Sequence, residues 1–476
     1  MRAKNLFIGG FLCLFSLGYS FSYAKNSEKD LEAARQLVIQ KTNPPNLNQQ
    51  EKPLNQSFPK KIDLETAITL ALQNNPSLKQ ALQEVLISGN NIQQVGYIEN
   101  PEISANFPIG EKDNSTQVFP GVSASQNVLD IYLAKLRKRA ANSQLEVTKL
   151  QTAASAYELV TQVKKSFYTL QAIEQFRRQL SSIVQTTKVA AELSARQLQA
   201  GNITELELNT QKLIVEQAEI ELVKSEAELR SARAKLAELL GQPELASKIS
   251  VEKNLPTLPK KEMALDALEE MALSNRLDLA ALKQKTGVFT QEYKLAKWQA
   301  FPSFRFGVEY ERDPDVGTLV GPSIGFQVPI FNRGQAKKQL AQIQMTQNQY
   351  AILALENGIR TEVKEANSRL IESRELAFRY QQKIIPLLGN NLKETQLQYN
   401  FMLKGVYDLL QIRREQINAQ RQYVEAIRDY WIEWASLERA LGTRINLENI
   451  GKMKKSSQSS ESKPSSQTDA REEKKS

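Results

Sequence analysis

The chain repeats one pattern of residues after a constant interval. Five positions near the start of the first copy return 201 positions later: Leu64, Ala71, Leu72, Asn74 and Leu78 recur as Leu265, Ala272, Leu273, Asn275 and Leu279. Pro101 returns as Pro302, and Leu240-Gly241 returns as Leu441-Gly442. A duplication limits the folds that remain possible, because both copies must form the same unit. Each copy has the pattern of a short helix, a second helix, two strands, a very long helix, a tight turn and a long returning helix.

Long helices dominate both copies. Gly and Pro number only 20 and 17 in 476 residues, a usage that favours long helices over a string of compact domains. Apolar residues recur at alternating steps of three and four, the spacing of a coiled coil, as in Leu129, Leu133, Leu136, Ala140, Ser143, Val147 and Leu150. The first long helix of each copy should extend for about 105 Å, given about 70 residues at 1.5 Å each. Pro386 interrupts it in the second copy, where we expect a kink.

A glycine is expected to reverse each long helix. The first turn is Ala200-Gly201-Asn202-Ile203, and the second is Leu403-Lys404-Gly405-Val406. Glycine adopts without steric cost the left-handed conformation that ends many helices. The sequence therefore predicts hairpin tips at residues 200–203 and 403–407.

Four segments have the alternation of β-strands, two in each copy: residues 101–108, 117–128, 302–312 and 317–331. Alternating segments of about ten residues that carry aromatic side chains are typical of transmembrane strands. A soluble β-hairpin with one buried face has the same pattern. Four strands cannot close a barrel, and lipid does not tolerate an open strand edge. If these strands span a membrane, several chains must share one barrel.

The N-terminus has the pattern of a secretory signal peptide. Arg2 and Lys4 precede an apolar stretch, and cleavage is expected after Ala24. An uncleaved membrane anchor is the alternative.

The composition of the remaining chain sets the expected domain boundaries. We expect an extended polar arm after the signal peptide and a disordered tail rich in Lys and Ser at the C-terminus. Two repeats separated by a linker lie between these ends. The expected order is signal peptide 1–24, arm 25–61, first repeat 62–241, linker 242–262, second repeat 263–442 and tail 443–476.

The residue types that are missing exclude several kinds of chemistry. The chain has no histidine, which excludes Ser-His-Asp and Cys-His catalysis and zinc sites built on imidazole. Its single cysteine, Cys13, lies in the predicted signal peptide. We expect no enzyme, no cofactor and no bound metal. The net charge is +9, but basic residues alternate with Glu along helix faces, which indicates solvated surface more than nucleic-acid binding.

Together these features resemble the TolC family of outer-membrane efflux channels, over nearly all of residues 62–441. The order, spacing and duplication of the motifs carry the resemblance. The paired motifs are Ala71-Leu72-Gln73-Asn74 with Ala272-Leu273-Ser274-Asn275, and Leu239-Leu240-Gly241 with Ala440-Leu441-Gly442. The turn Val328-Pro329-Ile330-Phe331-Asn332-Arg333-Gly334 is similar to the heavy-metal, CzcC-like branch.

The resemblance implies a mainly α-helical protein with a small β part. Three chains would form a homotrimer, with four strands from each chain closing a shared 12-stranded transmembrane β-barrel in the outer membrane. Duplicated coiled-coil hairpins would form a periplasmic tunnel, closed at its tips until a periplasmic adaptor and an inner-membrane pump, expected to be of the RND type, dock there. The channel would be a passive exit duct for metal cations or small toxic organic compounds.

The resemblance also assigns candidate residues at the tips. Asp408 follows the second tip, where acidic residues of the family ring the constriction, and Gln411 stands at the next such position. The residues where adaptor hairpins would pack are Gly201, Asn202, Gly405 and Tyr407. Ordinary turn chemistry, with an Asp favoured by the helix dipole, explains these residues equally well.

Four aromatic residues have competing interpretations. Trp431 and Trp434 are expected to pack inside the last helical hairpin and not to bind a ligand. Tyr310 and Phe331 are candidates for an aromatic girdle at the membrane interface, and simple packing explains them as well.

Two other classes of protein remain open. A periplasmic adaptor also carries helical hairpins, but it would have one hairpin between two halves of a lipoyl-like β-domain. A cytosolic coiled-coil scaffold would need neither the signal peptide nor the paired strands.

Overall fold

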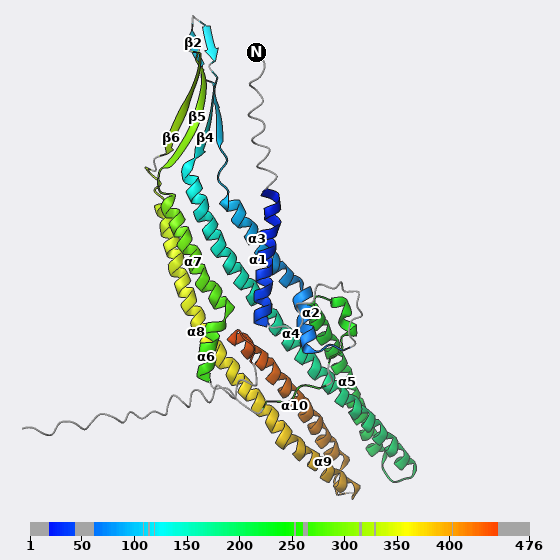
Figure 1. Ribbon diagram of the computed structural model, residues 1–476. Coiled ribbons are helices and arrows are strands. Elements are labelled where there is room, and N and C mark those ends of the chain that lie inside the picture. Colours follow the sequence, from blue (N-terminus) through cyan, green and yellow to red (C-terminus); the bar gives the residue numbers. More distant parts are fainter. Residues whose placement is uncertain are drawn as a thin grey trace, which may run out of the picture. The chain divides into compact units, whose positions relative to one another are not determined.

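The protein is described by a computed structural model over residues 19–42, 61–107, 109–112, 115–118, 120–251, 254–259, 265–313, 317–327, 330–401 and 403–445 (Figure 1). Helices make up most of this part of the chain. They are α1 Tyr19–Thr42, α2 Leu64–Asn74, α3 Pro76–Gly96, α4 Val128–Gln199, α5 Glu205–Leu239, α6 Leu265–Asn275, α7 Leu277–Trp298, α8 Gln335–Arg379, α9 Ile385–Asn400 and α10 Val406–Leu441, with a short 3₁₀ helix at Pro243–Lys248. No helix in the described ranges is apolar over enough of its length to cross a membrane.

The chain divides into two compact units. Unit 1 holds residues up to 170 together with 227–252 and 275–362, and unit 2 holds 171–226, 253–274 and the residues from 363 onward. The units change inside α4, α5 and α8, after residue 252, and at the end of α6.

The duplication seen in the sequence is a duplication of structure. Helices α2 and α6, α3 and α7, and α5 and α10 begin 201 residues apart, as do the first strands of the two copies. The predicted long helix of the first copy is α4, which continues for 72 residues.

A four-stranded antiparallel sheet in unit 1 has the order β1-β4-β5-β6. Its strands are β1 Glu102–Asn106, β4 Gly121–Asn127, β5 Ser303–Asp313 and β6 Gly317–Gln327. The last strand of the first copy, β4, pairs with the first strand of the second copy, β5. Figure 1 shows the sheet extending from the ends of α3, α4, α7 and α8.

The first copy contains more strand than the sequence predicted. Besides the predicted pair, β2 Ile109–Lys112 and β3 Ser115–Val118 form a two-stranded ribbon. The ribbon keeps the register of β1 and β4, because Ile109 opposite Val118 continues the series that ends with Asn106 opposite Gly121. Pro120 separates β3 from β4, since proline has no N–H to donate to the strand ladder.

The predicted extended arm over residues 25–61 is wrong for its first part. Helix α1 covers residues 19–42, and residues 43–60 lie outside the described ranges. Ala34 is buried in a cluster with Val85 of α3 and Leu145 of α4, and Asp30 forms an ion pair with Lys149 of α4 at 3.1 Å. This segment contains no proline, and many of its polar residues are good helix formers. One apolar stripe packed against α3 and α4 is therefore enough to stabilise it as a helix.

The end of the first repeat closes tightly on the turn between α2 and α3. The Asn75 side chain accepts hydrogen bonds from the N–H groups of Ser77 and Leu78, and it donates to the carbonyl of Leu239 at 2.9 Å. Gly241 has a φ of 70°, and a Cβ there would lie 2.5 Å from the carbonyl oxygen of Asn74. Only glycine satisfies both the left-handed backbone and this close approach.

In unit 2 the second long helix is interrupted where the sequence predicted it. Tyr380–Ile384 form a π-helical turn, in which the N–H of Ile385 donates to the carbonyl of Tyr380. Pro386 follows and has no N–H of its own, so the regular i to i−4 ladder cannot continue through this point.

The last helix of unit 2 packs through aromatic side chains. Tyr430 lies 5.3 Å from Trp431 between ring centroids, and Trp431 lies 6.2 Å from Trp434. The indole of Trp431 donates to the carbonyl of Pro256 at 3.1 Å. Both tryptophans are buried, which agrees with the predicted packing role.

Candidate functional site

The sheet has one apolar face. Residues directly opposite each other in an antiparallel register lie on the same face, and Val308 of β5 lies opposite Ala124 of β4 and Pro322 of β6. The large side chains of that face are all exposed: Ile103, Val122, Phe304, Phe306, Val308, Tyr310, Val320, Ile324 and Phe326. An apolar surface of this extent requires lipid or protein to cover it.

The opposite face is polar and lined by small residues. Arg305 of β5 forms an ion pair with Glu102 of β1 at 2.8 Å across this face. At Gly307 a Cβ would lie 2.5 Å from the carbonyl oxygen of Ala124 and 2.7 Å from Oγ of Ser323, so only glycine fits between β4 and β6. The alternation of an apolar and a polar face is that of a strand between lipid and water.

The sheet is open within the chain. Among the described strands β1 pairs only with β4, and β6 pairs only with β5. Both edges therefore leave backbone N–H and C=O groups available for a further strand.

An aromatic cluster at the junction of helices and sheet was missed by the sequence analysis. Trp298 at the end of α7 lies 4.6 Å from Tyr132 of α4 and 5.0 Å from Phe301, between ring centroids. These residues come from two copies, so no local motif connects them. Tyr310 lies on the apolar face of the sheet and Phe331, after β6, is 91% exposed.

The first helical tip is fixed by local hydrogen bonds. Gly201 has a φ of 76° and ends α4, with its N–H bonded to the carbonyl of Leu198 and the N–H of Asn202 bonded to that of Gln197. Thr204 starts α5. Its N–H donates to the Glu207 carboxylate at 2.8 Å, and its hydroxyl accepts from the Glu207 N–H at 3.3 Å. This reciprocal pair is a capping box.

The second tip is built differently, and one prediction about it is wrong. Gly405 does not end the preceding helix in a left-handed conformation, because it has φ −83° and ψ 165° and begins α10. Its counterpart in the first copy is Thr204, not Gly201. Asp408 accepts a hydrogen bond from the Gly405 N–H at 3.2 Å, as Glu207 does from Thr204. Both Asp408 and Tyr407 are exposed.

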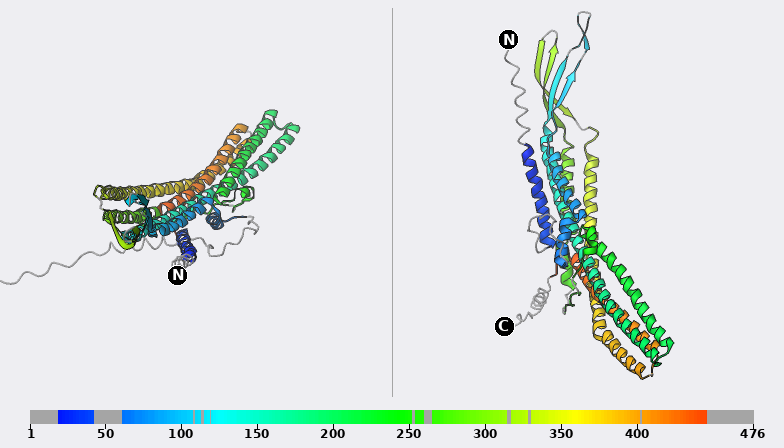
Figure 2. Two further views of the ribbon diagram at one scale, coloured as in Figure 1. Left: turned by 90° about the horizontal axis from the view of Figure 1, so that it is seen from above. Right: turned by 90° about the vertical axis from the view of Figure 1, so that its right-hand side faces the viewer.

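In unit 2 the two hairpins contact each other through α5 and α10, and both end at the same side of that unit (Figures 1 and 2). Arg414 of α10 donates to Gln217 of α5 at 2.6 Å, and Arg421 forms an ion pair with Glu221 of α5 at 3.5 Å. Gln411 donates to Glu415 of its own helix. Burial and the nearby charge of Glu207 raise the pKa of Tyr399 on α9.

A buried ion pair that the sequence analysis did not identify holds the start of α4. Asp130 bonds to Arg137 at 2.8 Å and accepts from the N–H of Glu99 at 2.7 Å, while Arg137 donates to the carbonyl of Val95 at 2.9 Å. Burial by itself would raise the pKa of Asp130, but the hydrogen bonds from Arg137 and Glu99 and the charge of Arg137 lower it below its ordinary value.

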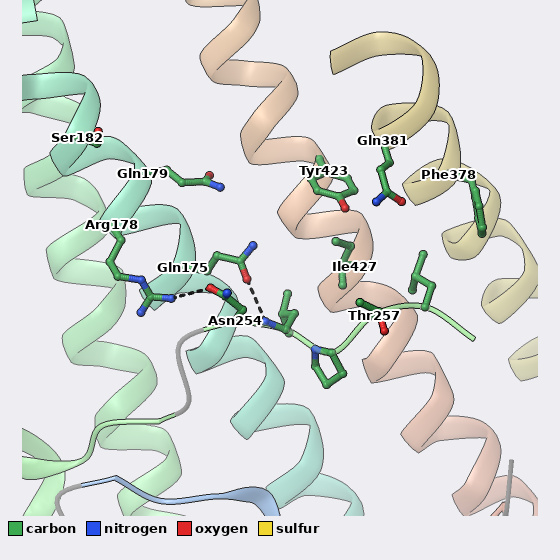
Figure 3. A pocket seen from close by; sticks show the side chains of 13 residues that line it. Gln175, Arg178, Gln179, Ser182, Asn254, Thr257, Phe378, Gln381, Tyr423 and Ile427 are labelled. Carbon is green, nitrogen blue, oxygen red and sulfur yellow. Dashed lines mark hydrogen bonds between the residues drawn. The ribbon is translucent and has the colours of Figure 1, made fainter. Parts of the chain in front are cut away.

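Unit 2 also contains an open groove of about 700 Å³ (Figure 3). It lies between α4, α10 and the segment 254–258, where Arg178 bonds to Asn254 and Gln175 accepts from the N–H of Leu255. Amide, hydroxyl and apolar side chains make up most of the remaining wall. None of the described residues that line it is a carboxylate.

Within the described ranges no group of three or more His, Cys, Asp or Glu side chains is arranged to hold a metal ion.

Comparison with known proteins identifies the family. Residues 67–242 match the family model described as outer membrane efflux protein. The chain is 23% identical over 389 residues to the cobalt-zinc-cadmium resistance protein CzcC of Cupriavidus metallidurans, covering 80% of this chain and 90% of that protein. These matches confirm the resemblance to outer membrane efflux proteins that the sequence predicted.

Two solved structures of bacterial membrane proteins share its fold. CusC matches with a TM-score of 0.67 and 18% identity, over 84% of this chain and 99% of that one. The outer membrane protein VceC of Vibrio cholerae matches with a TM-score of 0.66 and 16% identity, over 80% and 97%. The predicted family, fold and role as an efflux channel of the outer membrane are confirmed, and the adaptor alternative is not supported.

Proposed function

We propose that three copies of this chain close one transmembrane barrel and form a passive efflux duct. The single observation that carries the proposal is the open sheet, with an exposed apolar face and two unpaired edges in the described strands. In lipid each unsatisfied backbone group costs several kcal/mol, so β1 and β6 require partner strands. Closure by identical chains around one axis satisfies every edge at once.

The helical tips are the proposed docking site for a periplasmic adaptor and an inner-membrane pump of the RND type. Apolar side chains at the second tip support this role, since Phe401, Leu403 and Tyr407 are all more than two-thirds exposed. An exposed apolar cluster at the end of a hairpin is suited to packing against another helical hairpin. Gly201 and Asn202 at the first tip, with Gly405 at the second, would form the rest of this surface.

Asp408 is the proposed determinant of the constriction. Three copies around an axis would form a ring of carboxylates, which attracts cations and repels anions. The same carboxylate caps α10, so its charge and its capping role must be separated by experiment.

The proposed cargo is metal cations, with small toxic organic compounds as the alternative. The 23% identity to a cobalt-zinc-cadmium resistance protein supports metals. The chain has no histidine, and a passive duct requires no ligand set because it does not need to bind what passes through it.

The assembly is tested by membrane fractionation, detergent extraction and light scattering of the purified particle. We expect an outer-membrane particle with three times the mass of the processed chain. A monomer in detergent would contradict the shared barrel, whatever its location.

The role of Asp408 is tested by ion selectivity in planar bilayers. Asp408→Asn removes the charge but keeps an oxygen that accepts from the Gly405 N–H, so we expect the cation preference in the reversal potential to fall. Glu207→Gln is the matched control at the counterpart position and should leave the preference unchanged. If Asp408→Asn and the unaltered protein had equal ion selectivity, Asp408 would not line the constriction.

A further inference from the structure

The groove of unit 2 has a shape that is fixed by hydrogen bonds from both of its sides (Figure 3). Segment 254–258 crosses it and is bonded to two helices. Gln175 of α4 accepts from the N–H of Leu255 at 3.0 Å, and Trp431 of α10 donates to the carbonyl of Pro256 at 3.1 Å. A groove that is formed before a ligand arrives lowers the entropic cost of binding.

One wall of the groove is polar. Helix α4 supplies four of its side chains at helical spacing, so they share one face: Gln175, Arg178, Gln179 and Ser182. Among the lining residues that the structure describes, Arg178 is the one that carries a charge, and it bonds to the amide oxygen of Asn254 at 3.4 Å. This wall therefore offers amides, a hydroxyl and one positive charge.

The opposite wall combines apolar rings with further polar groups. Phe378 of α8 and Tyr423 and Ile427 of α10 line it, and Gln381 of the π-helical turn adds an exposed amide. Aromatic side chains present a flat apolar surface, and tyrosine adds a polar group to it. Burial raises the pKa of Tyr423, so its hydroxyl keeps its proton and is able to donate a hydrogen bond.

The Gln179 amide lacks a partner for one of its atoms. Its side-chain oxygen Oε1 is buried and accepts no hydrogen bond from the described part of the chain. Figure 3 shows this amide pointing from α4 into the groove. A buried acceptor without a donor is unfavourable, so a ligand that brings an N–H or O–H to this oxygen gains binding free energy.

The chemistry of the walls excludes several classes of ligand. Cations are disfavoured because Arg178 is positive and none of the described lining residues is a carboxylate. A purely apolar molecule would take water away from the amides without replacing its hydrogen bonds. A multiply charged anion would need more than one guanidinium to balance it. The ligand that fits is neutral or singly negative, rich in hydroxyl and amide groups, and has an apolar ring face.

We propose that this groove binds N-acetylated amino sugars, as part of an oligosaccharide. The acetamido N–H donates to Oε1 of Gln179, the ring hydroxyls bond to Ser182 and Gln381, and the apolar face of a sugar ring lies on Tyr423. The volume of about 700 Å³ is in the range of small-ligand sites. The site does not depend on the proposed duct, since every lining residue belongs to unit 2 of one chain.

Isothermal titration calorimetry of the full-length particle in detergent tests the binding. The probe is tetra-N-acetylchitotetraose, and the matched ligand is cellotetraose, which has hydroxyls in place of the acetamido groups. We expect cellotetraose to bind at least about tenfold more weakly, because a site built to bond an amide rejects a ligand without one. Equal affinity for the two tetrasaccharides overturns the proposed recognition.

Variants of single glutamines locate the site. Gln179→Met keeps the length of the side chain and removes the acceptor, so we expect about tenfold weaker binding and no fall in the thermal unfolding midpoint. Gln381→Met, at an exposed position, should weaken binding about threefold and decides the test if Gln179→Met fails to fold. Gln382→Met is the matched control, because Gln382 is exposed and does not line the groove. Equal binding by all three variants and the unaltered protein overturns the inference.

The source of the sugar is separated by sedimentation with isolated cell-wall sacculi, whose glycan contains N-acetylated amino sugars. Co-sedimentation that excess tetra-N-acetylchitotetraose abolishes assigns the site to the cell-wall glycan. Binding of the tetrasaccharide without co-sedimentation keeps the site and assigns it to free oligosaccharides. A particle that binds neither overturns the inference, whereas its mass and ion selectivity still test the proposed function independently.

Discussion

The two helical tips begin their returning helices at counterpart positions but cap them with different groups. At the first tip the Thr204 hydroxyl and the Glu207 carboxylate form a reciprocal pair, and Gly201 ends the preceding helix. At the second tip Gly405 has no side chain to accept a hydrogen bond. Here the Asp408 carboxylate accepts a bond from the Gly405 N–H, and no side chain accepts one in return. The duplication has preserved where the chain reverses, while the hydrogen bonds that hold the reversal have diverged.

A second difference separates the two junctions between sheet and long helix. In the first copy the buried pair Asp130–Arg137 ties α4 to the chain before β1. In the second copy the junction turns at Gly334, which has a φ of 68° and accepts the first helical bond from Lys338. A buried ion pair therefore stabilises the junction between sheet and long helix in the first copy, whereas a left-handed glycine shapes this junction in the second.

The largest expected effect is at the first junction. Asp130→Ala leaves Arg137 without its buried partner, which should lower the free energy of unfolding by about 3 kcal/mol. The effect is measured by urea unfolding of the purified particle, followed by circular dichroism. Asp429→Ala, which removes a half-exposed partner of Arg428, is the control and should cost less than about 1 kcal/mol.

The lowered pKa of Asp130 also predicts that the stability of the protein depends on pH. Because the pKa of Asp130 is lowered in the folded chain, its contribution is present above the unfolded value of about 3.9 and is lost as the pH falls through the lower folded value. The difference in stability between Asp130→Ala and the unaltered protein should therefore shrink below about pH 4. If the difference in stability stayed the same below about pH 4, the pair would stabilise the fold by packing and not by charge.

An intermediate effect distinguishes two glycines with similar backbones. Gly241→Ala should cost about 2–4 kcal/mol, because it adds a clash with the Asn74 backbone to the strain of a left-handed conformation. Gly201→Ala meets no atom within 4 Å and should cost about 1 kcal/mol from backbone strain alone. Thermal unfolding of both variants measures the difference. Equal costs would show that the turn between α2 and α3 moves away to accommodate the new methyl group.

The smallest expected effects sharpen the comparison of the tips. Thr204→Ala removes half of a capping box and should lower the stability by about 1 kcal/mol. Gly405→Ser should stabilise the second tip by a few tenths of about 1 kcal/mol. Hydrogen exchange at the first turns of α5 and α10 measures both, with about fivefold faster exchange expected in Thr204→Ala. If Gly405→Ser slows no amide of α10, the second tip lacks room for a serine cap, and the two tips differ by more than one side chain.

Much of the fold was predictable because its signals are local and repeated. The offset of 201, the heptads of α4 and the alternation in β5 each follow from side chains that face a common direction at a fixed period. The interruption near Pro386 was predictable for the same reason, since the missing N–H is a property of one residue. The helix α1 was missed because its stripe is short and its neighbours are polar.

The sites were less predictable than the fold. Gly405 was assigned the role of Gly201 because both are glycines in a turn, yet the structure places it at a helix start, where extended backbone suits any residue. The Asp130 pair and the Trp298 cluster join segments far apart in the sequence, so no spacing indicates them. The roles proposed for Asp408, Tyr407 and Asn202 remain predictions.

By itself the sequence determined that this chain is a duplicated helical hairpin with paired strands and no imidazole chemistry, because periodicity and composition are properties of the chain alone. Only the tertiary structure decided which strand of one copy meets which strand of the other, which faces are left exposed, and how each tip is capped. Those features depend on distances between residues remote in sequence, and folding alone brings such residues together.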